Sequence, residues 1–316
     1  MAGARSARMR HVAERSRLVR PLVDRFIAGA LERDAVATAR RLTDEDLLVT
    51  LDYLGEDVMS ADQARATVAA YRSILKIVGA NGLGANVEVS LKLSAVGQSL
   101  GTGGEQLALD GALAICAAAA EAGTTVTLDA EDYTTISSTL KIHSRAHAEF
   151  PWLGIAIQAY LKRAEADCQE LARAGCRVRL CKGAYVAPES ASYKGGAVSD
   201  SYRRCLATLL SSNAYPMIAT HDPAMIDAAK SLIAQFQRSR DSYEFQLLYG
   251  VRPEEQRALS AENRVRVYVP YGDEWYPYFM RRLAERPANL RFFVRAAASA
   301  VTGPMRRSGT SVGGVE

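Results

Sequence analysis

Eight short runs of alternating apolar and polar residues, separated by helix-length segments, are the feature of this sequence that most restricts its fold. The runs are 48–53, 87–94, 125–129, 154–158, 178–182, 217–220, 243–248 and 265–269. Alternation with a period of two indicates strands, and strands that alternate with helices form parallel sheets. Eight such units predict an α/β fold of the TIM type, a closed (β/α)8 barrel.

The regions outside these runs set the expected domain boundaries. Residues 1–47 precede the first run and are predicted to form an N-terminal helical segment. Residues 48–301 form the predicted barrel. Residues 302–316 are rich in Gly and Ser, which is typical of a flexible C-terminal tail.

Composition narrows the class of protein. The chain is 48% hydrophobic and 23% charged, close to the globular average, and no run approaches the roughly 18 apolar residues that span a bilayer. Its five cysteines stand at scattered spacings without a CxxC pair, which suggests neither a metal site nor a disulfide framework. Free thiols favour a cytoplasmic location.

The first 25 residues are strongly basic. They carry seven arginines against Glu14 and Asp24, a charge of +5, whereas the whole chain carries +4. Leu18, Leu22 and Phe26 recur every four residues, which favours a basic helix packed on the body. A targeting peptide, or an arm that touches the inner membrane face, remains the alternative. No aromatic residues cluster with the arginines, so nucleic-acid binding is not indicated.

The alternation within the runs separates the two faces of each strand. In a barrel the apolar alternate residues face the helices and the others point inward, where the last one lies near the active-site mouth. In the second run Val87, Val89 and Leu91 therefore face outward. The last inward position is polar in six runs: Lys92, Asp129, Gln158, Arg179, Gln246 and Tyr268. These side chains are predicted to converge on one mouth.

Two explanations fit so many polar side chains inside a barrel. Barrel interiors are usually filled with branched apolar residues, and an unpaired buried charge is costly. The polar set therefore forms either a ligand site or a layer of satisfied ion pairs, for instance Lys92 with Asp129.

Seven stretches of the chain resemble proline dehydrogenases, and together they cover the whole barrel. They are VSLKLSAVG (89–97), LDAED (128–132), IQAYLKR (157–163), RLCKGAY (179–185), IATHD (218–222), FQLLYGVR (245–252), and VYVPYG (267–272) followed by YFMRRLAERPAN (278–289). One stands at the end of nearly every predicted strand, in chain order. The resemblance implies a (β/α)8 barrel whose last helix lies over the mouth.

The resemblance implies FAD as cofactor, held without a dinucleotide-binding fingerprint. In agreement, the Gly-rich run 101–104 lacks the third glycine of that fingerprint and does not directly follow a strand. The implied cofactor contacts are Ala130, Gln158, Arg179, Lys182, Gly183, Ala184, Tyr185, Thr220, His221 and Glu285. Gln158 and Arg179 would meet the isoalloxazine ring. Without the resemblance, the sequence favours a structural role for His221, as a lone histidine at a strand end.

The same resemblance implies L-proline as substrate and 1-pyrroline-5-carboxylate as product, with no metal. Asp129 and Arg179 would be catalytic. The implied substrate contacts are Lys92, Tyr185, Leu248, Tyr268, Arg281 and Arg282. Arg281 and Arg282 are adjacent on a predicted helix, about 100° apart, so a narrow solvent-facing stripe suits only one of them. Paired guanidinium groups suit the proline carboxylate.

Two positions depart from the family pattern. Val186 stands where KGAYW has its tryptophan, which removes an aromatic wall, and Asp222 stands where ATHN has its asparagine. The second change puts an acid beside the expected cofactor phosphates. Both are expected to weaken FAD retention.

The resemblance implies a quinone as the electron acceptor. A chain of 316 residues leaves no room for the aldehyde dehydrogenase module of bifunctional relatives, which implies the monofunctional bacterial type and a separate pyrroline-5-carboxylate dehydrogenase for the product. Two alternatives stay open. One is a Schiff-base aldolase barrel with Lys92 or Lys182 as nucleophile, and the other is a ligand-binding barrel without turnover.

Overall fold

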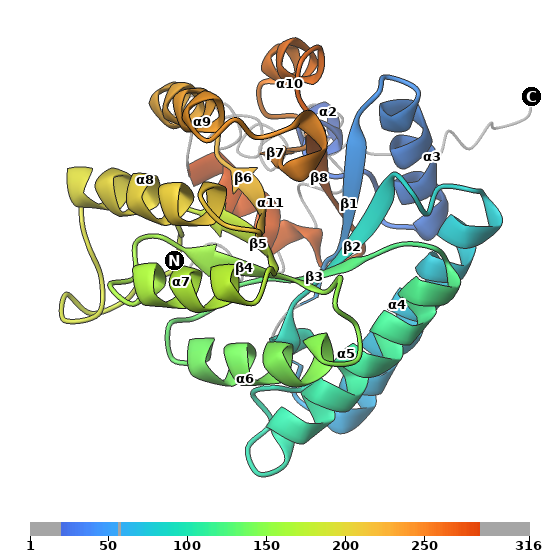
Figure 1. Cartoon of the computed structure of the whole chain (residues 1–316). Coiled ribbons are helices and arrows are strands. Elements are labelled where there is room, and N and C mark those ends of the chain that lie inside the picture. The colour runs from blue at the N-terminus through green and yellow to red at the C-terminus, as the bar shows by residue number, and fades with distance from the viewer. Residues whose placement is uncertain (1–19, 56–57, 285–316) are drawn as a thin grey trace, which may run out of the picture. The chain divides into compact units, whose positions relative to one another are not determined.

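Eight parallel strands close into a barrel in the order in which they occur along the chain (Figure 1). The strands are β1 (Leu48–Tyr53), β2 (Val87–Leu91), β3 (Val126–Leu128), β4 (Gly154–Gln158), β5 (Arg177–Cys181), β6 (Tyr215–Ala219), β7 (Glu244–Leu248) and β8 (Val265–Tyr271). The last strand returns to pair with the first, from Leu48 opposite Arg266 to Tyr53 opposite Tyr271. The predicted (β/α)8 fold is confirmed.

The computed structural model describes residues 20–55 and 58–284. The chain divides into one compact unit of residues 26–275, which contains the barrel, and a second unit of residues 1–25 and 276–316. The described part of the second unit contains α2 (Arg20–Asp24) and all but the first residue of α11 (Trp275–Ala284). The predicted tail and most of the basic N-terminal segment lie outside the described residues.

Helices cover the outer face of the barrel (Figure 1). They are α3 (Glu32–Thr43), α4 (Ala61–Ala80), α5 (Gly104–Glu121), α6 (Ile136–His147), α7 (Ala164–Arg173), α8 (Gly196–Leu210), α9 (Pro223–Gln235) and α10 (Pro253–Ser260), with short 3₁₀ helices η2 (Leu93–Val96) and η3 (Arg240–Ser242). None of the helices in the described ranges is long and apolar enough to cross a membrane.

The hydrophobic core lies between the strands and these helices. Val49 and Leu51 of β1, and Val87, Val89 and Leu91 of β2, are each at most 1% exposed. Because successive side chains of a strand point to opposite faces, the polar residues between these apolar ones point into the barrel, as predicted.

Several strand bounds differ from the predicted runs by one or two residues, and the largest difference is in the second run. The second run was expected to continue as a strand to residue 94, but β2 ends at Leu91 and residues 93–96 form η2. Lys92 is the N-cap of η2, so it lies one residue beyond the end of the strand.

Candidate active site at the barrel mouth

Five of the six predicted inward side chains form one hydrogen-bonded cluster. Asp129 lies at its centre. One carboxylate oxygen accepts hydrogen bonds from Tyr268 Oη at 2.6 Å and Lys92 Nζ at 3.3 Å, and the other accepts from Arg179 Nη1 at 2.6 Å. Arg179 Nε donates to Gln246 Oε1 at 2.6 Å. The predicted convergence is confirmed for these residues.

Gln158, the sixth, is buried and donates from Nε2 to the backbone oxygen of Glu131, 2.8 Å away, just beyond β3. Gly183 lies beside it with φ +97°, and a Cβ there would lie 2.2 Å from the Tyr160 ring and 3.1 Å from Gln158 Oε1. Glycine is required at this position both by its backbone angle and by the close approach of the loop after β4.

Asp52, which sequence reasoning missed, is a further member of the site. Lys92 Nζ lies 2.7 Å from Asp52 Oδ1, closer than to Asp129. The alternation of LVTLDY turns Val49 and Leu51 outward and therefore Asp52 inward, so the signal was present in the sequence. We call Asp52, Lys92, Asp129, Arg179 and Tyr268 the mouth cluster.

Arg179 is held on three sides. Its Nη1 donates to Ser90 Oγ at 2.7 Å as well as to Asp129, and its Nη2 donates to Glu88 Oε1 at 3.1 Å. With the bond to Gln246, four of the five N–H groups of the guanidinium are engaged. The side chain therefore has one fixed position.

Below the mouth cluster, a second set of charges fills the amino-terminal end of the barrel. Glu88 lies 2.9 Å from Arg177, and Glu244 lies 2.7 Å from Arg266, with both distances measured between the closest nitrogen and oxygen. We call these four residues the lower layer. Each occupies the first inward position of its strand. The prediction from the sequence concerned only the last inward position of each strand and therefore did not include these four residues.

Both sets are electrically balanced. The mouth cluster has two cations and two carboxylates, and so does the lower layer. Burial opposes ionisation of Asp129, but Lys92 and Arg179 outweigh it and lower the pKa of its carboxyl. Burial likewise opposes ionisation of Glu88, yet Arg266, Arg177 and Arg179 lower its pKa from 4.5 to about 2. The polar side chains inside the barrel therefore do form satisfied ion pairs, including Lys92 with Asp129.

His221 and Thr220 follow β6 and have structural contacts. His221 Nε2 accepts the backbone N–H of Leu248 at 2.9 Å, which ties the ends of β6 and β7 together. Thr220 Oγ1 accepts the N–H of Asp222 at 3.1 Å. The structural interpretation of His221 thus has direct support.

Lys182 and Asp222 form an ion pair beyond β5 and β6. Lys182 Nζ lies 2.7 Å from Asp222 Oδ2 and 2.9 Å from Ser199 Oγ. Asp222 also accepts the N–H of Ala224, so it caps α9. Hydrogen bonding to Lys182 lowers the pKa of Asp222. The acid that departs from the family pattern is thus occupied by a neighbouring cation.

Five more predicted or departing positions lie near these strand ends, four on loops and one, Leu248, at the end of β7. Ala130 and Tyr185 pack against a small cluster that includes Tyr160 and lies at the loops after β3, β4 and β5. Leu248 lies opposite Tyr268 in the register of β7 and β8. Ala184 and Val186 are exposed on the loop after β5.

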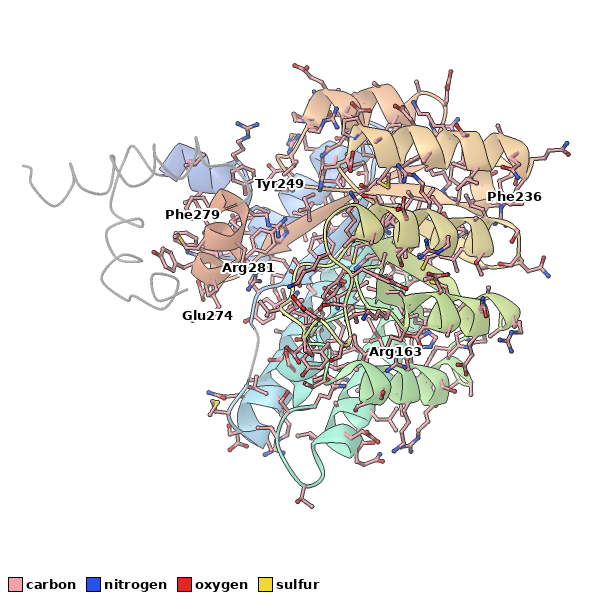
Figure 2. The ribbon with its side chains drawn as sticks, turned by 90° about the vertical axis from the view of Figure 1, so that its left-hand side faces the viewer. Arg163, Phe236, Tyr249, Glu274, Phe279 and Arg281 are labelled. Carbon is pink, nitrogen blue, oxygen red and sulfur yellow. The ribbon has the colours of Figure 1, made fainter. Side chains whose placement is uncertain are left out.

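Arg281 and Arg282, the arginines predicted to bind the carboxylate, lie in the last turn of α11. Arg281 is labelled on this helix in Figure 2. The Arg282 guanidinium stands over the Tyr278 ring, 5.3 Å from its centroid. Glu285, the predicted adenosine contact, lies outside the described residues.

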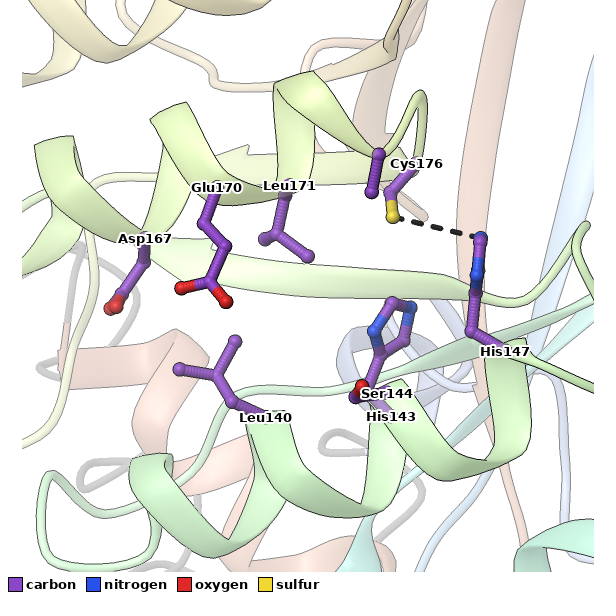
Figure 3. Close-up of a pocket in the computed structure, with 9 residues that line it drawn as sticks. Leu140, His143, Ser144, His147, Asp167, Glu170, Leu171 and Cys176 are labelled. Carbon is purple, nitrogen blue, oxygen red and sulfur yellow. Dashed lines mark hydrogen bonds between the residues drawn. The ribbon is translucent and has the colours of Figure 1, made fainter.

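A separate pocket of about 120 Å³ lies outside the barrel, between α6 and α7 (Figure 3). Within it Cys176 Sγ lies 3.6 Å from His147 Nε2, and His143 Nε2 bonds the Leu153 oxygen. Burial lowers the pKa of His143 to about 4, so the ring is neutral near pH 7. The lining contains no residue of the mouth cluster, and His143 ties α6 to the segment before β4.

Comparison with known proteins gives one consistent family. A model of the family described as proline dehydrogenase matches residues 35–295. Proline dehydrogenase 1 of Bacillus subtilis (strain 168) is 40% identical over 273 residues, which are 86% of this chain and 89% of that protein. Proline dehydrogenase of Deinococcus radiodurans is 38% identical over 278 residues, 87% of this chain and 89% of that protein.

Among solved structures, the chain is similar to proline utilization A from Bdellovibrio bacteriovorus, crystallised after inactivation by N-propargylglycine. The TM-score is 0.80 at 23% identity, over 91% of this chain. The match spans only 36% of the other chain. At this identity the likeness concerns the barrel fold.

Proposed function

This chain belongs to the proline dehydrogenase family, and we propose that it oxidises L-proline to 1-pyrroline-5-carboxylate with bound FAD. The observation that carries the proposal is the mouth cluster, which gathers charged side chains from strands far apart in the sequence at the end of the barrel where enzymes of this fold have their sites.

The side chains beyond β4, β5 and β6 suit FAD. Gln158, Lys182 and Thr220 offer amide, ammonium and hydroxyl groups, which match the polar ring edge and the phosphates. Asp222 is the one group that opposes phosphate, and it is paired with Lys182. We assign Ala130, Gly183, Ala184, Tyr185, His221 and Glu285 to the remaining cofactor contacts. When bound, FAD supplies a hydride acceptor.

Arg179 and Asp129 have different roles in this proposal. Arg179 holds positive charge at the ring edge, where it favours negative charge that develops during hydride transfer. Asp129 already accepts hydrogen bonds from Ser90, Lys92, Arg179 and Tyr268, and its pKa is lowered. A carboxylate so engaged orients Lys92 and Tyr268 and is a poor base, so we assign the amine proton of proline to solvent.

We place the proline carboxylate against Arg281, Arg282 and Lys92, with Tyr185, Leu248 and Tyr268 around the ring. This requires α11 to lie over the mouth. Support comes from α3, which packs on β1 and β8. A regular barrel covers these two strands with the helix that follows β8, so here that position is already occupied.

The contacts of the lysines argue against a Schiff-base aldolase. Such a mechanism needs a nucleophilic amine. Lys92 lies 2.7 Å from Asp52, and Lys182 lies 2.7 Å from Asp222. An ammonium group paired with a carboxylate is a poor nucleophile. A ligand-binding barrel without turnover is distinguished by the first experiment below.

We propose a quinone as electron acceptor, a separate pyrroline-5-carboxylate dehydrogenase as the next enzyme, and a cytoplasmic location. A quinone dissolves in the membrane, so the enzyme must touch that surface. The +5 charge of residues 1–25 suits contact with anionic lipid.

The test begins with the purified protein. It is expected to be yellow, to release FAD on denaturation, and to form 1-pyrroline-5-carboxylate from L-proline, detected by mass spectrometry, with a soluble quinone as acceptor. N-Propargylglycine, which inactivates the Bdellovibrio protein, is expected to inactivate it progressively. A protein that binds L-proline without forming product would be the barrel without turnover.

Arg281→Met and Arg282→Met test the placement of the substrate. Loss of one partner of a buried charge pair costs roughly 2 to 5 kcal/mol, so kcat/KM for proline should fall about 30-fold or more while the flavin spectrum is retained. Arg257→Met, an exposed arginine on α10, is the matched control. Unchanged binding of carboxylate-bearing proline analogues in both variants would refute the placement.

A further inference from the structure

The lower layer contacts Arg179 from two directions. Glu88 Oε1 accepts the Arg179 Nη2 hydrogen directly, at 3.1 Å. Gln246 Oε1 accepts the Nε hydrogen, while Gln246 Nε2 donates to Glu244 Oε1 at 2.6 Å. Glu244 is in turn held by Arg266 at 2.7 Å. The two routes fix the two edges of the guanidinium that face away from Asp129.

The orientation of the Gln246 amide is determined by these partners. Its oxygen faces a guanidinium, which only donates, and its nitrogen faces a carboxylate, which only accepts. A flipped amide would place like against like on both sides. Gln246 therefore transmits the position of Glu244 to Arg179.

Glu88 has contacts that exceed those of a simple ion pair. Its side chain is 1% exposed and lies within salt-bridge distance of Arg177, Arg179 and Arg266. Thr50 Oγ1 also donates to it at 2.8 Å. A carboxylate shared among three arginines sets how much of the positive charge of Arg179 remains uncompensated.

We propose that Glu88, from the amino-terminal end of the barrel, is a positioning residue for Arg179: it fixes the guanidinium and sets its net charge toward the flavin. This inference rests on the proposed function. It distinguishes the lower layer from a layer that only stabilises the barrel, the usual role of that end of the fold.

The proposal predicts opposite signs for two neighbouring substitutions. Glu88→Gln keeps the side-chain shape but removes a negative charge beside Arg179, which should stabilise the negative charge of reduced FAD. The flavin midpoint potential should become more positive. Arg177→Gln removes a positive charge from the other side of Glu88, so the potential should become more negative. The double variant restores the balance and should lie near the parent.

The measurement is the midpoint potential of FAD in the holoenzyme for the parent and the three variants. We expect a change of threefold or more in the ratio of affinities for reduced and oxidised FAD, which is about 14 mV for two electrons. Glu244→Gln also removes one negative charge, but Glu244 reaches Arg179 only through the Gln246 amide, so this variant should have a smaller effect on the potential. Urea unfolding of the flavin-free proteins records stability separately.

The outcomes are distinct. If Glu88→Gln does not fold, Arg177→Gln decides, because the Arg177 side chain is 20% exposed and its loss is milder. Potentials equal to that of the parent in every folded variant, with stability alone changed, would overturn the inference and leave the lower layer purely structural. A parent protein without flavin would instead overturn the proposed function.

Discussion

The mouth cluster and the lower layer are chemically alike but lie at opposite ends of the barrel. Each contains two cations and two carboxylates in ion-pair contact. The central carboxylate of the mouth, Asp129, is 12% exposed, whereas Glu88 and Glu244 below it are 1% and 0% exposed. The mouth lies where the loops after the strands meet, and the lower layer lies at the opposite end.

This difference teaches that inward charge alone does not identify a site. Neutral ion-pair networks occur at both ends of this barrel, and the one at the carboxyl ends of the strands lies at the same end as Gln158, Gly183 and Lys182. Arg179 joins the two networks. Substitutions at the mouth should therefore lower ligand affinity as well as stability, whereas those below should act on stability and, through Arg179, on the flavin potential.

Arg179→Met should have the largest effect, because it belongs to both regions. It removes a donor from Glu88, Ser90, Asp129 and Gln246. We expect a loss of roughly 3 to 5 kcal/mol in unfolding free energy, and a fall of about 10²- to 10³-fold in flavin reduction by proline. Urea melts and stopped-flow absorbance check these. Flavin reduction at the parent rate would eliminate its role.

Arg266→Met and Lys92→Met compare the two regions directly. Loss of Arg266, which is 5% exposed, leaves Glu244 without its closest cation and should cost roughly 3 to 5 kcal/mol. Loss of Lys92 leaves Asp129 with Arg179, Ser90 and Tyr268, but it also takes the ammonium group away from the buried Asp52, so a similar loss of stability is expected together with a raised KM for proline. The comparison is wrong if Lys92→Met leaves KM for proline unchanged.

Acid should weaken the fold through the lower layer. The pKa of Glu88 is lowered from 4.5 to about 2, so its ionised form favours folding. This contribution, on the order of 3 kcal/mol, is fully present above about pH 4.5 and is lost as the pH falls toward 2. The gap in unfolding free energy between the parent and Glu88→Gln should narrow over that window. If the unfolding free energies of the parent and of Glu88→Gln changed in parallel with pH, Glu88 would not be the source of the acid sensitivity.

Tyr268→Phe should have the smallest effect. It removes the hydroxyl that donates to Asp129 at 2.6 Å but keeps the ring that is proposed to enclose the substrate. Asp129 retains three other donors. We expect about 1 kcal/mol, or roughly fivefold in KM for proline. Tyr268→Leu, which also removes the ring, should raise KM further, and equal effects of both variants would contradict the ring contact.

The sequence was sufficient for the barrel and for the convergence of Lys92, Asp129 and Arg179, because alternation with a period of two determines which side chains point inward. The same rule applied to every inward position would have found Asp52 and Glu88. It could not have shown which of these groups touch, because contacts across a barrel depend on the register between strands that are distant in the sequence.

Contacts made by loops were beyond prediction for a different reason. His221 accepts the N–H of Leu248, and Lys182 pairs with Asp222, only because the ends of adjacent strands bring those loops together. Neither pair has a local sequence pattern. The resemblance gave both His221 and Lys182 as cofactor contacts but not their partners within the protein.

The most direct test of the central claim is anaerobic addition of L-proline to the purified protein while the flavin absorbance is recorded. We predict that L-proline bleaches the yellow spectrum at a rate that saturates with concentration, and that Arg179→Met retains the spectrum but is bleached far more slowly. Dithionite should bleach both proteins, which shows that the flavin can be reduced. A parent protein whose flavin is bleached by dithionite but not by L-proline would contradict the claim.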